Sequence, residues 1–280
     1  MMDKLKPLLN FIALSVFIAG SIWSVHQILD ANLTFNFHYL FIILLVAAPI
    51  SLLLSISRFQ ILARLYGGRF TFVESANVVI LGGLANLLPI PGALLVRLAA
   101  IRTKVGSKKS VLANAIGVGL WLIACLLVLS FAFFWELDTN YDAALLVLSI
   151  LLLFVLTMFL RYTNGSIKYF LQLCLVQIPL TVVNTLRLWL LCLSIGYVVD
   201  LILPASVSLA SILVSGASIT PGGIGVAELM SSSIAHQLNY PASVGFIMLS
   251  GNRLITWIWF SLALLVIRKL DIDQKVTKSV

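Results

Sequence analysis

The chain has 280 residues, of which 61% are hydrophobic and only 10% are charged. A soluble domain usually carries roughly a quarter charged residues, and a mean hydropathy of +1.11 leaves too little polar surface to cover one water-soluble core. This composition excludes soluble enzymes, DNA-binding domains and disordered scaffolds. It predicts an all-α, polytopic protein of the cell membrane, or of the inner membrane where a cell has two.

Six apolar stretches are long enough to cross a bilayer as helices, which takes about 20 residues. They are 8–29, 39–57, 111–135, 143–160, 169–195 and 242–267. Lys4 and Lys6 precede the first stretch as they would precede a secretory signal. Its apolar run is longer than that of a typical signal, however, and no small-residue cleavage site follows it, so we expect a retained span.

Two further apolar blocks, 72–101 and 204–238, are each interrupted by proline and glycine. The interruptions are Asn86-Leu87-Leu88-Pro89-Ile90-Pro91-Gly92 and Thr220-Pro221-Gly222-Gly223-Ile224-Gly225. Because proline lacks a backbone donor and clashes with the preceding turn, neither block is expected to form one straight helix. Each is either a kinked span or a re-entrant hairpin that leaves the membrane on the side where it entered.

The distribution of charge selects between these alternatives, because cytoplasmic loops carry an excess of Lys and Arg. If both blocks are hairpins, the loops rich in Lys and Arg lie on one side with both termini, and the acidic loops lie on the other. The basic loops contain Arg58, Arg64, Arg69, Arg102, Lys104, Lys108, Lys109, Arg161 and Lys168, and the acidic ones contain Glu136, Asp138, Asp142 and Asp200. We therefore predict two re-entrant hairpins and cytoplasmic termini. Membrane orientation also accounts for the net charge of +8, so no nucleic acid partner is expected.

The predicted order of elements repeats within a single membrane domain, 1–280. Two spans, an interrupted block and another span occur over 8–135 and again over 143–267, followed by a cytoplasmic tail, 268–280. The second copy begins on the opposite side of the membrane, and Leu88-Pro89 corresponds to Thr220-Pro221. Inverted repeats with paired, interrupted segments are typical of alternating-access transporters, whose substrate sites lie between the halves.

Four ionisable residues fall deep within the apolar blocks: Arg97, Arg187, Glu228 and Arg253. Such groups cost at least about 2.5–3.5 kcal/mol each in a bilayer, so they usually face a cavity or a partner. In one interpretation, Glu228 neutralises one arginine and helix-end carbonyls hold the others. In the other, the arginines lie at different depths and pass an anionic headgroup between leaflets, because a guanidinium binds phosphate in a bidentate manner.

The residues at the two interruptions extend this candidate substrate site. Gly222, Gly223 and Gly225 directly precede a new helical arm, whose free N–H groups are suited to binding an anion; alternatively, the glycines only permit a tight turn. Asn86 either contacts substrate or satisfies backbone groups of the broken helix. Pro89, Gly92, Thr220 and Pro221 complete the predicted site.

At Asn86-Leu87-Leu88-Pro89 with Gly92 and Arg97, and at Thr220-Pro221-Gly222-Gly223-Ile224-Gly225 with Glu228, the chain resembles a known family. This is the transmembrane, flippase-like domain of lysylphosphatidylglycerol synthase, the multiple peptide resistance factor, with its standalone relatives. The resemblance covers about 1–270 and implies movement of lipid between leaflets. The chain ends at Val280, so the soluble synthase domain is expected to be absent. In that family an acidic residue often follows the glycine of the first motif, whereas Ala93 and Leu94 follow Gly92 here, so no acidic partner for Arg97 is expected at this tip.

The leading hypothesis is thus a flippase or facilitator for an anionic phospholipid or a polyprenyl-phosphate-linked lipid. It would be driven by a gradient, with Glu228 as a candidate proton carrier, or by consumption of lipid on the far side. The alternative is a non-transporting subunit that anchors or regulates a glycosyltransferase or another lipid-modifying enzyme, since relatives of the resembled family are associated with glycosyltransferases.

An enzyme is not expected, because the motifs of intramembrane proteases and of prenyl or CDP-alcohol transferases are missing. No GxxxxGK[ST] loop is present to bind ATP. The three cysteines, Cys125, Cys174 and Cys192, lie in apolar stretches without ligand spacing, which predicts neither a metal nor a cofactor.

Overall fold

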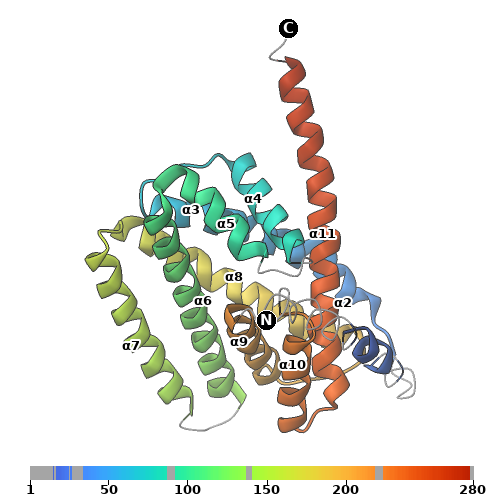
Figure 1. Ribbon diagram of the computed structural model, residues 1–280. Coiled ribbons are helices and arrows are strands. Elements are labelled where there is room, and N and C mark those ends of the chain that lie inside the picture. Colours follow the sequence, from blue (N-terminus) through green and yellow to red (C-terminus); the bar gives the residue numbers. More distant parts are fainter. Residues whose placement is uncertain are drawn as a thin grey trace, which may run out of the picture.

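Figure 1 shows the computed structural model of the chain. The structure describes residues 15, 17–24, 26, 34–86, 92–136, 141–217 and 223–277. For 215–217 and 268–277 it describes the backbone alone. Every regular element in this part of the chain is a helix. In order these are α2 (Phe37–Ile42), η1 (Ile43–Ala47), α3 (Ala48–Arg64), α4 (Phe72–Ala85), α5 (Gly92–Val105), α6 (Ser107–Glu136), α7 (Tyr141–Tyr162), α8 (Ile167–Ser194), α9 (Ile202–Ala217), α10 (Val226–Gln237) and α11 (Ala242–Thr277).

Five helical segments among the described residues are long and apolar enough to cross a membrane: Phe37–Arg64, Ser107–Glu136, Tyr141–Tyr162, Ile167–Ser194 and Ala242–Ile267. They coincide with five of the six predicted spans, to within a few residues at most ends. About half of the first predicted span, 8–29, lies outside the described residues, and its described stretch 17–24 is helical. α11 continues to Thr277, so most of the segment predicted as a tail extends this last helix.

The first of these segments is continuous from α2 through η1 to α3 and contains one wide turn. In that turn the N–H of Ala48 donates to the carbonyl of Ile43, five residues earlier. Pro49 follows directly and has no N–H to donate to the carbonyl four residues before it. The missing hydrogen bond gives a local reason for the wide turn. π-type turns of this kind often occur near functional sites, and Ser51, two residues beyond Pro49, belongs to the site described below.

The first interrupted block forms two helices, α4 and α5, that lie side by side and run in opposite directions. At one end, a Cβ added at Gly92 would overlap the carbonyl of Ala85, so only glycine permits this close approach. At the other end, Lys104 Nζ lies 3.7 Å from Glu74 Oε1. Each arm has 14 residues, which gives about 21 Å, shorter than the roughly 30 Å hydrocarbon core.

The second interrupted block forms a similar antiparallel pair, α9 and α10. Near the interruption, a Cβ added at Gly223 would lie 2.9 Å from Val214 Cγ1. At the opposite end, the N–H of Asp200 donates to the hydroxyl of Tyr240 over 3.1 Å. The arms have 16 and 12 residues, so they too are short relative to the bilayer core.

The helix bundle has one basic end and one acidic end. The turns after α3, α5 and α7 meet at the basic end, where the hydroxyls of Tyr66 and Thr163 lie 2.7 Å apart and Lys104 lies over the ring of Phe70. At the acidic end, Glu136 accepts from the N–H of Leu201. The α4–α5 hairpin opens toward the basic end, where the C-terminal part of α11 also emerges, and the α9–α10 hairpin opens toward the acidic end (Figure 1).

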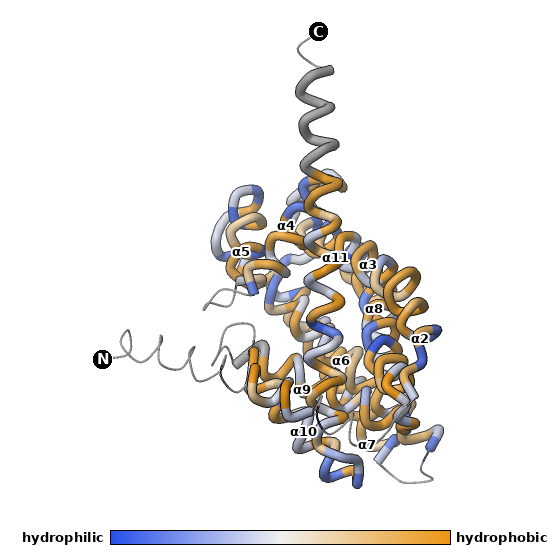
Figure 2. The backbone as a smooth tube through the Cα atoms, turned by 90° about the vertical axis from the view of Figure 1, so that its right-hand side faces the viewer, coloured by the Kyte–Doolittle hydropathy of each residue, from blue (hydrophilic) through white to orange (hydrophobic). Residues whose placement is uncertain are grey.

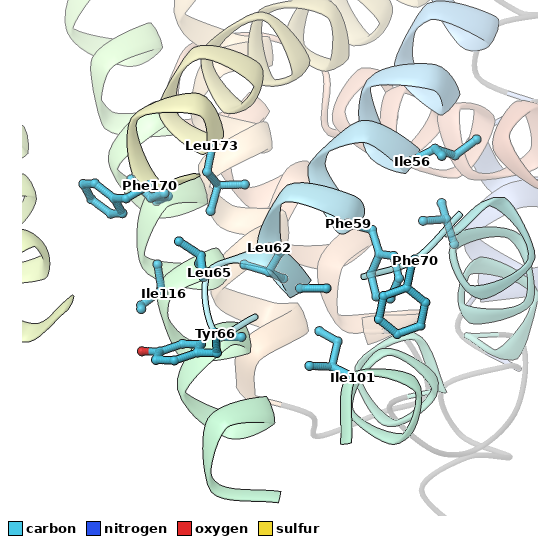
Figure 3. Packing of buried hydrophobic residues seen from close by; sticks show 14 of the residues in the cluster. Ile56, Phe59, Leu62, Leu65, Tyr66, Phe70, Ile101, Ile116, Phe170 and Leu173 are labelled. Atoms are coloured by element: carbon cyan, nitrogen blue, oxygen red, sulfur yellow. The ribbon is translucent and has the colours of Figure 1, made fainter. Parts of the chain in front are cut away.

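The largest buried apolar cluster among the described residues joins α3, α4, α5, α6, α7 and α8 near the basic end (Figure 3). Ile56, Phe59 and Leu62 of α3 belong to this cluster with Ile101 of α5, and Phe59 packs edge-on against Phe70. Many large apolar side chains also lie exposed on the outside of the bundle, and most helical turns of the tube in Figure 2 carry hydrophobic residues. α7 buries only Ser149 and Leu160 and exposes most of its other apolar side chains, which is the arrangement expected of a helix that faces lipid.

Candidate functional site

The structure places eight of the twelve predicted site residues, on four helices and their caps. Arg97 lies on α5, Arg187 on α8, Glu228 on α10 and Arg253 on α11. Asn86 and Gly92 flank the α4–α5 interruption, and Gly223 and Gly225 precede α10. The remaining four, Pro89, Thr220, Pro221 and Gly222, lie outside the described residues.

Arg253 and Glu228 form a buried ion pair between α11 and α10. Arg253 Nε lies 2.9 Å from Glu228 Oε1, and the exposed fractions of the two side chains are 16% and 0%. Figure 2 shows a hydrophilic stretch part-way along α11, where its neighbouring turns are hydrophobic. A carboxylate enclosed in this way is stabilised only while a cation or a hydrogen-bond donor opposes it.

Glu228 also caps the helix on which it lies. Its Oε2 accepts from the N–H of Gly225 over 2.8 Å, and Gly225 has a φ of +81°, which L side chains rarely adopt. One of the N–H groups predicted to be free for an anion is therefore already occupied by a carboxylate. Both glycines here fit the tight-turn interpretation, since Gly223 also has a positive φ of +72°.

Arg187 is buried in a polar network that connects α8, α3 and α11. It is 4% exposed and donates to Ser51 Oγ over 3.3 Å and to Thr256 Oγ1 over 2.8 Å. Its third acceptor is the carbonyl of Asn252, at 3.5 Å. Because Asn252 is adjacent to Arg253, the Arg187 guanidinium lies beside the turn of α11 that carries Arg253. The two arginines were expected at different depths, and the structure brings both side chains to neighbouring turns of α11. α8 crosses the bundle obliquely (Figure 1), which a count along the sequence does not reveal.

Arg97 lies within electrostatic range of a second arginine, Arg58 on α3. Arg58 is 9% exposed, donates to the carbonyl of Gly117 over 2.7 Å and lies 5.6 Å from the centre of the Trp121 ring. The Nε atoms of both arginines are buried without a hydrogen-bond partner. Among the described residues, no carboxylate lies within ion-pair distance of Arg58, Arg97 or Arg187.

Arg58 was predicted to lie in a cytoplasmic loop, and the loop position is wrong. α3 continues to Arg64, and Arg58 lies inside it among buried neighbours. The apolar residues after Arg58 keep a helical spacing, with Phe59, Leu62 and Ala63 buried. This helical spacing, which a loop would not require, was the feature of the sequence that could have shown that the helix continues past Arg58.

Asn86 closes the α4 side of the first interruption. Its Oδ1 accepts from the N–H of Ala93 over 2.9 Å and so satisfies a donor in the first turn of α5, where helical amides lack internal partners. This contact matches one of the two roles predicted for Asn86, that of a hydrogen-bond partner for backbone groups of the broken helix. It holds the first turn of α5 against the last turn of α4.

Replacing Gly92 with alanine is expected to lower the stability of the protein by about 1–3 kcal/mol, because the new methyl group overlaps the Ala85 carbonyl. Thermal unfolding in a mild detergent measures this effect. Gly119→Ala is the matched control, since its Cβ would meet only the flexible end of Leu156, at 3.2 Å. Equal unfolding temperatures for the two variants would contradict the close approach of α4 and α5.

The chain shows limited similarity to known proteins. It is 35% identical over 99 residues to the UPF0104 membrane protein MJ1595 of Methanocaldococcus jannaschii, a match that covers 34% of this chain and 29% of that protein. The chain is a multi-pass helical membrane protein. It matches less than a third of the length of that relative, whose name gives no activity. No family model matches the chain, and no solved structure matches it, so the resemblance to the lysylphosphatidylglycerol synthase domain stays a prediction.

The described residues contain no group of three or more His, Cys, Asp or Glu side chains placed to hold a metal ion. The three cysteines are unpaired, with Cys125 and Cys192 buried and Cys174 partly buried. The distinctive chemistry of the site is therefore its guanidinium groups, four in all among the described residues of the inner bundle, opposed by one carboxylate. Such a set is suited to binding an anion with several oxygen atoms.

Proposed function

We propose that the protein moves an anionic lipid between the leaflets of the cell membrane by alternating access. The observation that carries the proposal is the excess of inward-facing cations: Arg58, Arg97 and Arg187 have no carboxylate partner among the described residues. Uncompensated charge in an apolar bundle is costly. A phosphate group entering from the bilayer would supply the missing countercharge, while its acyl chains remain in lipid.

The proposal includes six full spans, with 8–29 as the first, and two re-entrant hairpins in an inverted repeat. It is supported by the short arms of both hairpins and by their opening toward opposite ends of the bundle. By the positive-inside bias, the basic end faces the cytoplasm, together with both termini. Paired interrupted helices of this kind place transporter sites near the middle of the bilayer.

The Arg253–Glu228 pair supplies an exchangeable contact within this mechanism. Glu228 pairs with Arg253 in the structure, and a phosphate oxygen that binds Arg253 would replace it. Glu228 would then take up a proton, because a buried carboxylate without a cation is unstable as an anion. This step gives a route for coupling lipid movement to a proton gradient.

The cargo is proposed as an anionic phospholipid or a polyprenyl-phosphate-linked lipid, because both present the phosphate that guanidinium groups recognise. The proposed activity is transport, with no chemical change in the lipid. A role as a non-transporting partner of a glycosyltransferase or another lipid-modifying enzyme is the outcome to accept if the isolated protein moves no lipid.

Leaflet exchange in proteoliposomes tests the proposal. Fluorescent phosphatidylglycerol and phosphatidylcholine are compared, and dithionite bleaches the probe in the outer leaflet. We expect the protein to accelerate exchange of phosphatidylglycerol more than that of phosphatidylcholine. Arg97→Gln should slow the anionic lipid by about tenfold, the effect of losing one charged hydrogen bond.

Arg161→Gln is the control for that variant, because Arg161 is an exposed arginine at the end of α7. It should exchange lipid at the wild-type rate. Equal exchange of both lipids, or an Arg97 variant as fast as wild type, would contradict the proposed site.

A further inference from the structure

A second cationic site lies at the basic end of the bundle, separate from the buried arginines. A pocket of about 610 Å³ is lined there by Arg64, Arg69, Phe70, Thr71, Glu74, Lys104 and Tyr169. We call it the basic pocket. Its walls come from the end of α3, the turn after it, the open end of the α4–α5 hairpin and the start of α8.

The charges in the basic pocket are only partly neutralised. Glu74 lies 3.7 Å from Lys104 and also accepts from the N–H of Thr71 in the capping box of α4. The side chains of Arg64 and Arg69 make no ion pair or hydrogen bond to any residue that the structure describes. Two guanidinium groups therefore border the cavity with their donors unused.

The position of the basic pocket relates it to the inner arginines. Arg64 follows Arg58 by six residues on α3, and Lys104 follows Arg97 by seven on α5, so each helix rises by about 9–11 Å between the two levels. The same two helices thus present cations first at the pocket and then at the Arg58–Arg97 level. Phe70 and Tyr169 add aromatic surface of the kind that lies at the boundary between headgroups and acyl chains.

We propose that the basic pocket binds a phosphate ester at the membrane surface, and that it is the docking site from which an anionic headgroup reaches Arg58 and Arg97. Binding at the pocket depends only on the guanidinium groups of Arg64 and Arg69. The onward path rests on the proposed function. The shared chemistry is a phosphate held by two guanidinium groups, and the ligand is either a lipid headgroup or a free phosphate.

Binding to the purified full chain in neutral detergent tests this proposal. The probes are dioctanoyl phosphatidylglycerol, dioctanoyl phosphatidylcholine and inorganic phosphate, titrated by microscale thermophoresis. We expect saturable binding of phosphatidylglycerol that is about tenfold or more weaker in Arg64→Gln/Arg69→Gln. Arg102→Gln/Arg161→Gln removes the same charge from exposed positions outside the pocket and should bind like wild type.

The outcomes separate the two possible ligands and the two proposals. Binding of inorganic phosphate as tight as that of phosphatidylglycerol would identify a free anion as the ligand and overturn the docking role for lipid. Equal binding of both lipids, or equal loss in both double variants, would overturn the pocket itself. If Arg97→Gln binds phosphatidylglycerol normally while neither the wild-type protein nor any variant moves lipid, the pocket stands and the transport proposal fails.

Discussion

Arg187→Gln is expected to slow exchange of phosphatidylglycerol by about tenfold to a hundredfold while leaving the thermal stability of the protein unchanged or increased. The two effects have opposite signs because Arg187 is a buried cation with no carboxylate partner. Its removal relieves a desolvation cost that the folded protein otherwise bears. Replacing a residue that served only to stabilise the bundle would instead lower the unfolding temperature.

The hydrogen bonds around Arg187 explain why the fold should tolerate its loss. Ser51 Oγ still donates to Asn184 Oδ1 over 2.8 Å, and Thr256 Oγ1 still donates to the carbonyl of Asn252 over 2.8 Å. In the variant, neither hydroxyl oxygen accepts a hydrogen bond from Arg187, but each hydroxyl hydrogen still has its acceptor. Neither hydroxyl is therefore left as a buried donor without a partner. Glutamine can restore one donor at the site.

The measurement pairs dithionite-based leaflet exchange with thermal unfolding of the same preparation. Arg187→Lys separates charge from shape, because lysine keeps the positive charge but cannot bind phosphate in a bidentate manner. We expect it to recover part of the exchange rate. A variant that loses both stability and transport would indicate that Arg187 mainly connects α3, α8 and α11.

The spans could be predicted from the sequence because a run of about 20 apolar residues has few other outcomes. The division of the two interrupted blocks into paired short helices was also indicated, by Pro89 and Pro221 and by the charges on either side. These signals are local, and they do not depend on how the helices pack.

The contacts of the charged residues could not be predicted in the same way, because they depend on tilt and rotation of the helices. Arg187 reaches the turn of α11 that contains Asn252 only because α8 crosses the bundle obliquely. Arg58 comes within electrostatic range of Arg97 through the packing of α3 and α5 in the bundle, which the sequence does not reveal. The pairing of Glu228 with an arginine was predicted as one alternative. Which arginine it pairs with could not be predicted, because the contact with Arg253 depends on how α10 packs on α11.

Arg253→Gln is expected to destabilise the protein by about 3–5 kcal/mol, the usual cost of removing one partner from a buried ion pair. The loss leaves Glu228, which is fully buried, as an unopposed carboxylate that must take up a proton or force local rearrangement. The prediction is opposite in sign to that for Arg187, although both changes replace a buried arginine with glutamine. The difference lies only in whether a carboxylate faces the guanidinium.

A double-mutant cycle with Glu228→Gln measures the pair directly. In the double variant Arg253→Gln/Glu228→Gln, the amide oxygen at position 228 can still accept from the N–H of Gly225, as Glu228 does now. No buried charge remains, so most of the lost stability should return while proton-coupled transport does not. If unfolding in detergent shows the two single changes to be additive, then Arg253 and Glu228 are not coupled, and the exchange of partners proposed for the transport cycle has no physical basis.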